Sequence, residues 1–164
     1  MDIKIRPIAQ KDWRDTWKII EPVFRAGDTY SFSTDITERQ AHEIWIEHPR
    51  ATYVAVDDAG RVLGTYFLKA NQPGQGAHVC NCGYIVADAA RGKGVASAMC
   101  GHSQVEAVRL GFRAMQYNLV VSTNDSAVRL WKKHGFEIVG TLPAAFLHPK
   151  AGYVDAYVMY KQLE

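Results

Sequence analysis

The chain has 164 residues and a mass of 18.3 kDa, and 48% of its residues are hydrophobic and 22% charged. This composition supplies one sizeable core, so intrinsic disorder is excluded and we expect a single domain over residues 1–164. The net charge of +2 is too small to indicate a nucleic-acid-binding protein. No apolar run reaches the roughly 18 residues of a membrane-spanning helix, and the first residues lack the apolar stretch of a signal peptide. We therefore expect a cytoplasmic protein with neither nucleic-acid nor membrane partners.

Hydrophobic periodicity and turn residues predict the element order β-α-α-β-β-β-α-β-α-β-β. Apolar residues at helical spacing occur at Trp13, Trp17, Ile20 and Phe24, and again at Val95, Ala98, Met99, Val105, Val108 and Phe112. The predicted strands cover residues 3–7, 52–56, 62–68, 78–86, 115–121, 136–142 and 153–160, and the predicted helices cover residues 13–26, 38–47, 95–112 and 124–135. Hairpins combined with strand–helix–strand units predict an α/β fold with a mixed sheet.

The three cysteines, at positions 80, 82 and 100, are an odd number, which argues against a disulfide framework. Cys80 and Cys82 have the spacing of alternate residues on one strand face. Neither a C-x-x-C pair nor a spaced histidine pair accompanies them, so no metal site is predicted. We interpret all three as small buried hydrophobic residues.

Residues 91–96 combine three features of an anion-binding site. Gly92 and Gly94 allow the backbone to approach a ligand and to direct successive N–H groups the same way. The segment opens a helix, whose start has unpaired N–H groups and a partial positive charge, and Arg91 and Lys93 add two cations. The surrounding residues 86–135 carry seven basic and three acidic side chains. This excess suits a small polyanion, and a solvated basic helix face is the alternative.

The same segment resembles the R-x-x-G-x-A signature of the GNAT superfamily of acetyl-CoA-dependent N-acyltransferases, with Arg91, Gly94 and Ala96 at the signature positions. Residues 124–136 are similar to the family's second landmark, a helix that begins at Asn and ends in Gly-Phe. The order of elements agrees over essentially the whole chain. The resemblance implies a mixed, mostly antiparallel sheet with helices on both faces. It also implies a splay between the fourth and fifth strands, which the co-substrate acetyl-CoA enters.

The resemblance further implies which residues hold acetyl-CoA. The fourth strand would offer backbone groups to the pantetheine arm as if the arm were another strand, and the amides of residues 91–96 would hold the pyrophosphate. Asn124 and Ser126 would approach the arm, although Asn is also a preferred helix N-cap and one amide can fill both roles. The implied cofactor-binding residues are Gly83, Tyr84, Ile85, Val86, Arg91, Gly92, Lys93, Gly94, Val95, Ala96, Asn124 and Ser126.

Two departures from the commonest family pattern affect the acid and base. Trp131 stands where many members carry the Tyr that protonates the leaving thiolate, and an indole N–H cannot deliver a proton efficiently. The strand at residues 78–86 lacks the Glu that some members use as base. Catalysis is then expected to depend on a neutral amine and on backbone N–H groups near Ile85 that stabilise the oxyanion.

Amide side chains are the remaining candidates for the site. Asn81 and Asn118 lie inside predicted strands, where Asn is disfavoured, so we interpret both as functional; bonding to loop backbone is the alternative. With Asn124 they resemble the GNAT branch that contains the fungal azetidine-2-carboxylate acetyltransferase, over the C-terminal two-thirds of the chain. That resemblance implies that Asn81 and Asn118 hold a small imino acid and that Asn124 assists acetyl transfer. Asn118 and Asn124 are therefore the predicted catalytic residues.

Aromatic and histidine side chains complete the predictions for the site. Tyr30 and Phe32, between the first two helices, are expected to wall the acceptor pocket, unless they only cover the core. His102 is expected to be structural, His134 to be a cation that suits a helix end, and His78 to be a candidate base at the pocket mouth.

The sequence thus predicts an N-acetyltransferase that moves an acetyl group from acetyl-CoA to a small amino- or imino-acid-like amine, by direct attack in a ternary complex. The alternatives are acetylation of a protein N-terminus or lysine, and a CoA-binding regulatory module without catalysis. Tyr153, Tyr157 and Tyr160 in the last strand suggest a homodimer, although alternation onto two faces is also ordinary strand behaviour.

Overall fold

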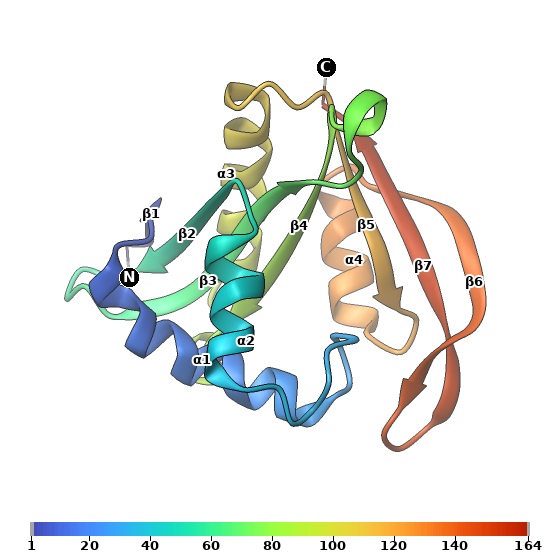
Figure 1. Ribbon diagram of the computed structural model, residues 1–164, viewed down its shortest axis with the longest axis horizontal. Helices are drawn as coiled ribbons and strands as arrows, with labels where there is room; N and C mark the ends of the chain where they lie inside the picture. Colours follow the sequence, from blue (N-terminus) through green and yellow to red (C-terminus); the bar gives the residue numbers. More distant parts are fainter. Residues whose placement is uncertain (1, 164) are drawn as a thin grey trace.

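The computed structural model describes residues 2–163 and confirms the predicted order of the main elements (Figure 1). The strands are β1 (Lys4–Pro7), β2 (Ala51–Val56), β3 (Val62–Ala70), β4 (Val79–Val86), β5 (Ala114–Val121), β6 (Glu137–His148) and β7 (Gly152–Gln162). The helices are α1 (Trp13–Ala26), α2 (Glu38–His42), α3 (Val95–Arg109) and α4 (Asp125–Lys133), and a π-helical turn, η2 (Glu43–Glu47), continues α2. None of the helices within residues 2–163 is long and apolar enough to cross a membrane.

The seven strands form one sheet in the order β1-β2-β3-β4-β5-β7-β6. All neighbours are antiparallel except β4 and β5, which run parallel and pair only at Val79 with Ala114 and Cys80 with Met115. Beyond these pairs the two strands diverge toward their C-terminal ends (Figure 1). The mixed, mostly antiparallel sheet with a splay between the fourth and fifth strands is therefore confirmed.

Helices cover both faces of the sheet, as predicted. On one face, α1 and the α2–η2 segment bury an aromatic and aliphatic cluster against Phe67 of β3 and Ile85 of β4. On the other face, α3 and α4 pack on Tyr66, Cys82 and Tyr117. Because side chains alternate along a strand, neighbouring residues of β3, β4 and β5 face different helical layers. This alternation decides which side chains reach each side of the splay.

One predicted boundary and one predicted buried residue need correction. Strand β6 continues to His148 instead of ending near residue 142, because the register shifts between Leu142 and Phe146 and interrupts the alternation. In α3, Val105 was predicted on the buried face but is 68% exposed. The buried face of α3 instead passes through Ser103 and Ala107.

The three cysteines are buried free thiols, as predicted. Burial raises the pKa of Cys80 to about 12 and also raises the pKa of Cys82 and of Cys100. These thiols therefore stay protonated at neutral pH and act as packing residues.

Candidate active site

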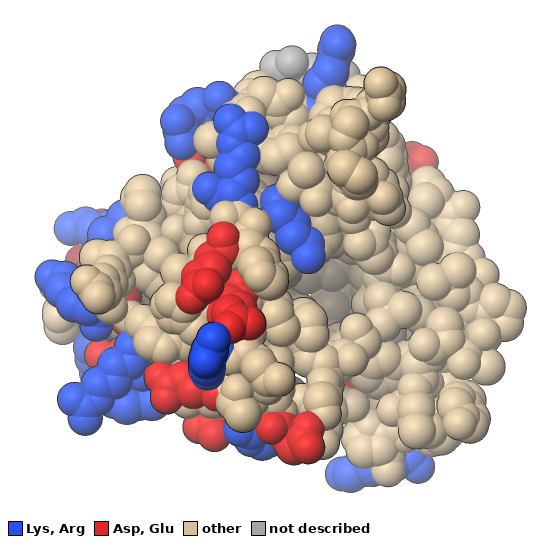
Figure 2. Space-filling model, viewed as in Figure 1, with Lys and Arg blue, Asp and Glu red and all other residues tan. Residues whose placement is uncertain are grey.

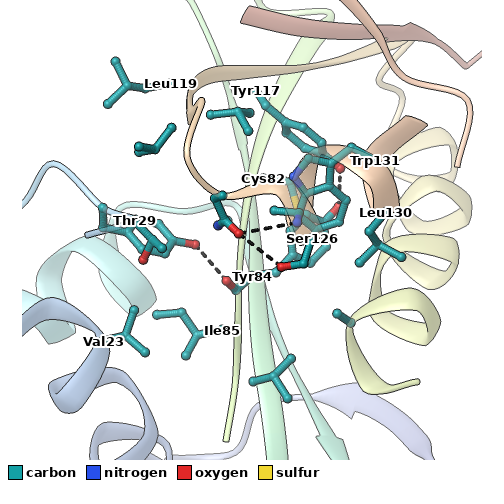
Figure 3. A pocket seen from close by; sticks show the side chains of 18 of the residues that line it. Val23, Thr29, Cys82, Tyr84, Ile85, Tyr117, Leu119, Ser126, Leu130 and Trp131 are labelled. Atoms are coloured by element: carbon teal, nitrogen blue, oxygen red, sulfur yellow. Dashed lines mark hydrogen bonds between the residues drawn. The ribbon is translucent and has the colours of Figure 1, made fainter. Parts of the chain in front are cut away.

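A cavity of about 780 Å³ occupies the splay between β4 and β5. Figure 2 shows a hollow in one face of the molecule, and Figure 3 shows the interior, with Thr29 and Ile85 on one side and Tyr117 and Trp131 on the other. The lining comes from the α1–α2 loop, β3, β4, β5 and the first turns of α3 and α4. All of the binding and catalytic residues predicted from the sequence contribute to this lining, except Lys93 and the candidate base His78. The fold thus brings the predicted residues together around one cavity.

The loop before α3 presents a row of unsatisfied backbone donors. Gly92 and Gly94 have φ angles of +72° and +82°, and a Cβ atom at either position would meet nothing within 4 Å. Glycine is therefore needed here for the left-handed backbone and not for space. From Gly92 to Ser97, no backbone N–H donates to an acceptor within residues 2–163. Six such groups at the start of a helix fit a diphosphate, whose oxygens accept hydrogen bonds from that geometry.

The two cations of this loop behave differently. Arg91 lines the cavity, and its Nε lies 3.4 Å from Asp88 Oδ1. Lys93 turns away and donates from Nζ to the Ala89 carbonyl at 2.7 Å. Of the seven basic residues in the segment 86–135, only Arg91 lines the cavity. A solvated surface therefore accounts for most of the positive excess in that segment.

Strand β4 directs alternate backbone groups into the splay. The Asn71 N–H donates to the Val79 carbonyl, and the Ala87 N–H donates to the Leu63 carbonyl, both at 2.8 Å. These bonds show that the odd-numbered residues of β4 bond to β3. The even-numbered residues beyond Cys80 face the diverging β5 instead, where no strand pairs with them.

The alternation of hydrogen bonds between β3 and β4 changes the expectation for the backbone of two residues. Gly83 and Ile85 line the cavity, but their backbone groups bond to Phe67 and Thr65 of β3. The backbone groups that point into the splay belong to Cys82, Tyr84 and Val86. Of the backbone N–H groups near Ile85, those of its two neighbours therefore face the splay.

Asn124 caps α4 and also lines the cavity. Its side-chain oxygen accepts from the Ala127 N–H at 3.4 Å and from the Ser126 hydroxyl at 3.3 Å. Its amide nitrogen donates to no acceptor within the described chain. The N-cap role is confirmed, and the amide N–H groups remain available to a ligand.

Asn81 and Asn118 also line the cavity, and each uses one amide hydrogen within the protein. Asn81 Nδ2 donates to the Gln116 carbonyl at 3.0 Å, which bridges β4 and β5 where they begin to separate. Asn118 Nδ2 donates to Asn71 Oδ1 at 2.7 Å, and its oxygen accepts from the Gln116 amide at 3.0 Å. Because an amide NH₂ carries two hydrogens, each side chain keeps one N–H for a ligand.

Tyr30 and Phe32 both wall the cavity and cover the core, so the two interpretations hold together. Their rings stack with centroids 5.9 Å apart, and Phe32 packs 4.9 Å from Phe24 of α1. The Tyr30 hydroxyl donates to the Tyr84 carbonyl at 2.9 Å, and burial raises the Tyr30 pKa. The loop between the first two helices is thus fastened to β4 at the splay.

Residues 11–136 match the Acetyltransferase (GNAT) family. The chain belongs to this family. N-acetyltransferase aca1 of Schizosaccharomyces pombe is 29% identical to it over 148 residues, which cover 80% of this chain and 71% of that protein. L-amino acid N-acetyltransferase AaaT of Escherichia coli is 33% identical over 101 residues, 61% of each protein. The structure of a GCN5-related N-acetyltransferase from Kribbella flavida matches with a TM-score of 0.93 and 42% identity, over 98% of this chain and 97% of that one.

This GNAT chain is therefore an acyltransferase, and its acid–base equipment can be compared with the expected departures. Trp131 lies 4.9 Å from the Tyr84 ring and 5.1 Å from the Tyr117 ring, measured between centroids. The Tyr84 hydroxyl hydrogen-bonds to Tyr117 at 2.9 Å and to Ser103 at 2.7 Å. Burial raises the pKa of both tyrosines well above the usual value, so neither is a good proton donor to a thiolate. Sequence reasoning missed Tyr117, because strand alternation assigns it to the core.

None of the three histidines considered from the sequence is a base in this cavity. His78 is exposed and does not line it, so its expected place at the mouth is wrong. His102 Nδ1 hydrogen-bonds to the Tyr66 hydroxyl at 2.7 Å, which confirms a structural role. His134 hydrogen-bonds to Ser97. Burial, and to a smaller extent the charge of Lys161, lowers the pKa of His134, so the prediction that His134 is a cation is wrong. Lys161 supplies the charge at the end of α4 by donating to the His134 carbonyl at 2.8 Å.

A second cavity of about 630 Å³ adjoins the first and shares Arg91 and Asn124 with it. It contains His148, whose Nδ1 accepts from the N–H groups of Lys150 and Ala151 at 3.1 Å each. These two bonds tie the His148 ring to the turn between β6 and β7.

Proposed function

We propose that this GNAT chain is an N-acetyltransferase that moves an acetyl group from acetyl-CoA to the amine of a small amino- or imino-acid-like acceptor. The observation that carries the proposal is one continuous cavity through the splay. The α3 loop, whose backbone N–H groups from residue 92 to residue 97 are unpaired within residues 2–163, borders this cavity, and the amides of Asn81 and Asn118 also line it. A cofactor and a small acceptor can therefore meet inside the sheet.

When bound, acetyl-CoA supplies the acetyl group as an electrophilic thioester. The N–H groups of residues 92–97 hold its diphosphate, and Arg91 adds a cation beside them. The splay-facing backbone of Cys82, Tyr84 and Val86 pairs with the pantetheine arm in place of a strand. The amide N–H groups of Asn124 donate to the same arm or to the thioester oxygen.

The chain's own groups favour the reaction by positioning and by electrostatics. Within the described residues, no Asp, Glu or His lines the cavity. The acceptor amine consequently loses its proton to water and attacks as a neutral nucleophile. The backbone N–H groups of Tyr84 and Val86 stabilise the oxyanion, and loss of one such donor typically costs about 3 kcal/mol of transition-state stabilisation. Trp131, Tyr84 and Tyr117 form one wall of the cavity beside the thioester, and water in the cavity reprotonates the thiolate.

The comparisons support the acceptor class. The E. coli relative is named an L-amino acid N-acetyltransferase, and the fungal relative is an N-acetyltransferase. The amide trio Asn81, Asn118 and Asn124 agrees with the azetidine-2-carboxylate branch suggested by the sequence. We assign Asn81 and Asn118 to the acceptor and Asn124 to the transfer step.

A thiol-release assay with acetyl-CoA tests this function. The acceptor panel comprises L-amino acids, proline and azetidine-2-carboxylate, together with peptides that offer a free N-terminus or a lysine. We expect the protein to acetylate the small amino and imino acids and none of the peptides. Preferred turnover of peptides would contradict the acceptor class. Thermal stabilisation by CoA with no turnover of any amine would identify a binding module and overturn the enzymatic proposal.

We further propose that two copies associate through the β6–β7 hairpin. This hairpin is at the edge of the sheet, and it exposes Val139, Leu147 and Tyr153 by 59%, 62% and 73%. The surface over β6 and β7, on the right of Figure 2, carries few charged side chains. Sedimentation should show a dimer that the pair of substitutions Leu147→Lys and Tyr153→Lys dissociates, whereas a monomeric wild type would contradict the proposal.

A further inference from the structure

One cation in the cavity has no anionic partner. Lys69 of β3 is half-buried and lines the cavity, yet no carboxylate among residues 2–163 lies within 4 Å of its ammonium group. Its Nζ lies instead 5.4 Å from the centre of the Phe67 ring. The ammonium group is therefore available to an anionic ligand in the cavity.

The Phe67 ring helps to fix the position of the Lys69 side chain. The Phe67 ring occupies the space that a Cβ atom would need at Gly83, with only 2.6 Å between that position and a ring carbon. The ring is thus locked against β4, and an ammonium group above it is attracted to the ring face. The cation is held at the cavity wall before any ligand arrives.

Strand alternation places Lys69 with the acceptor-side amides. Lys69 and Asn81 are direct cross-strand partners, so they project from the same face of the sheet. The Asn118 side chain bonds to Gln116 at 3.0 Å and to Asn71, two residues after Lys69, at 2.7 Å, so its amide lies on the same side of the cavity as Lys69. Tyr30 and Phe32 close this side of the cavity.

The two cations of the lining serve different groups. Lys69 and Arg91 are its only charged residues within the described chain. Arg91 follows the end of β4, whereas Lys69 pairs with Asn81 near its beginning, and the strand between Asn81 and Val86 spans roughly 16 Å. A phosphate at the α3 loop is therefore too distant to neutralise Lys69. Lys69 is therefore left to bind a second anion, on the acceptor side.

We propose that Lys69 is the cationic anchor for a carboxylate of the acceptor, and that Asn81 and Asn118 each donate their remaining amide hydrogen to it. This inference rests on the proposed function and narrows it. The acceptor is an amino or imino acid with a free carboxylate, not a simple amine, an amide or the N-terminus of a peptide. A carboxylate offers about four acceptor sites, which matches one ammonium group and two amides. No acid among residues 2–163 lines the cavity, so the carboxylate of the acceptor is the group that orients it.

Matched pairs of acceptors test this assignment. Each pair is a carboxylate and its carboxamide: L-proline and L-prolinamide, L-methionine and L-methioninamide, azetidine-2-carboxylate and its amide. The protein variants are Lys69→Met, which keeps the aliphatic stem, and Lys69→Arg, which keeps the charge. Lys150→Met, in the exposed β6–β7 turn, is the matched control for removal of a surface lysine. For each pair, the ratio of the two KM values is compared between variants. The amine basicity of each acceptor is the same for every variant, so it cancels in this comparison.

We expect Lys69→Met to raise KM for the carboxylates about 10- to 100-fold, as expected for the loss of a charge-assisted hydrogen bond, and to change KM for the carboxamides less than about twofold. The Lys69→Arg variant should retain most of the preference for carboxylates over carboxamides, and the Lys150→Met variant should retain all of it. The affinity for CoA should be unchanged in all three variants.

An equal rise in KM for both members of a pair, or an unchanged preference, would overturn the role of Lys69. Turnover of carboxamides as good as that of carboxylates in the wild type would leave the transferase standing and remove the carboxylate anchor. If CoA binds but no amine reacts, the proposed function fails. Calorimetry with the N-acetylated carboxylate and carboxamide on the CoA complex then decides the anchor separately, and equal affinities would overturn it.

Discussion

The two sides of the splay are built from different chemistry. On the side of α3 and α4, the proposed binding groups are mostly backbone N–H and C=O, with the Asn124 amide added, and the side chains Tyr84, Tyr117 and Trp131 pack against one another. On the side of α1, the cavity exposes an ammonium group and side-chain amides with hydrogens to spare. A site made of backbone depends on local conformation, whereas a site made of side chains depends on residue identity. Cofactor binding should therefore respond to changes in the loop, and acceptor choice to single side chains.

The largest expected effect is on the backbone side. Gly94→Val places a branched side chain at φ +82°, which moves the N–H row and should weaken CoA binding by about 100-fold, as for two lost bonds to a charged group. Gly111→Val is the matched control, since Gly111 has φ +92° and equally open surroundings. Both variants should lose about 1–2 kcal/mol of stability. Calorimetry with CoA should separate them, and equal loss of affinity would show that strain alone is responsible.

Asn124 should have the next largest effect, because it serves the helix cap and the cofactor through different atoms. Asn124→Asp keeps the cap oxygen and loses the amide hydrogens, whereas Asn124→Ala loses both. We expect kcat to fall about tenfold in both variants, as for one lost hydrogen bond. Only the Ala variant should lose about 1 kcal/mol of stability from the cap. Unchanged turnover in the Asp variant would remove Asn124 from the mechanism.

The packed aromatic side chains Tyr84, Tyr117 and Trp131 should contribute more to the free energy of unfolding than to kcat. Tyr117→Phe removes a buried hydroxyl bonded to Tyr84, which should cost about 1–2 kcal/mol of unfolding free energy. Because burial raises the Tyr117 pKa and keeps the hydroxyl protonated, kcat should change less than about twofold. Denaturant unfolding and the thiol-release assay measure the two quantities. A large fall in kcat at unchanged stability would indicate that Tyr117 donates a proton. It would then contradict the proposed difference between the two sides of the splay.

The smallest expected effect is a pH dependence of stability near neutrality. Burial lowers the pKa of His102 and of His134, so the unfolded chain binds protons more readily than the folded one. Their contribution is complete above the unfolded value of about 6.5 and is lost as the pH falls through the lowered folded values. The double variant His102→Gln, His134→Gln should flatten the decline of unfolding free energy just below pH 6.5. An unchanged decline would mean that other groups produce it.

Local signals predict much of this fold and less of its site. Periodicity gave the element order, and the glycine loop marked the start of α3 correctly. The phase of the β3–β4 ladder could not be predicted, because it depends on register and not on residue type. That phase turns the backbone of Ile85 away from the splay and that of its neighbours into it.

Side-chain partnerships were also beyond a linear sequence. In the sequence Lys69 resembles an ordinary lysine at a strand end, and only the structure places it in the cavity lining with no acid of residues 2–163 beside it. His134 was expected to be charged because helix ends favour cations, but Lys161, distant in sequence, takes that role. Such outcomes depend on neighbours that only tertiary packing supplies.

A crystal structure with CoA and an N-acetylated acceptor tests the account most directly. The diphosphate should lie on the N–H groups of residues 92–97, the pantetheine along Cys82, Tyr84 and Val86, and the acceptor's carboxylate against Lys69. A complex in which this loop is empty while CoA binds elsewhere would contradict the assignment of both sides of the splay.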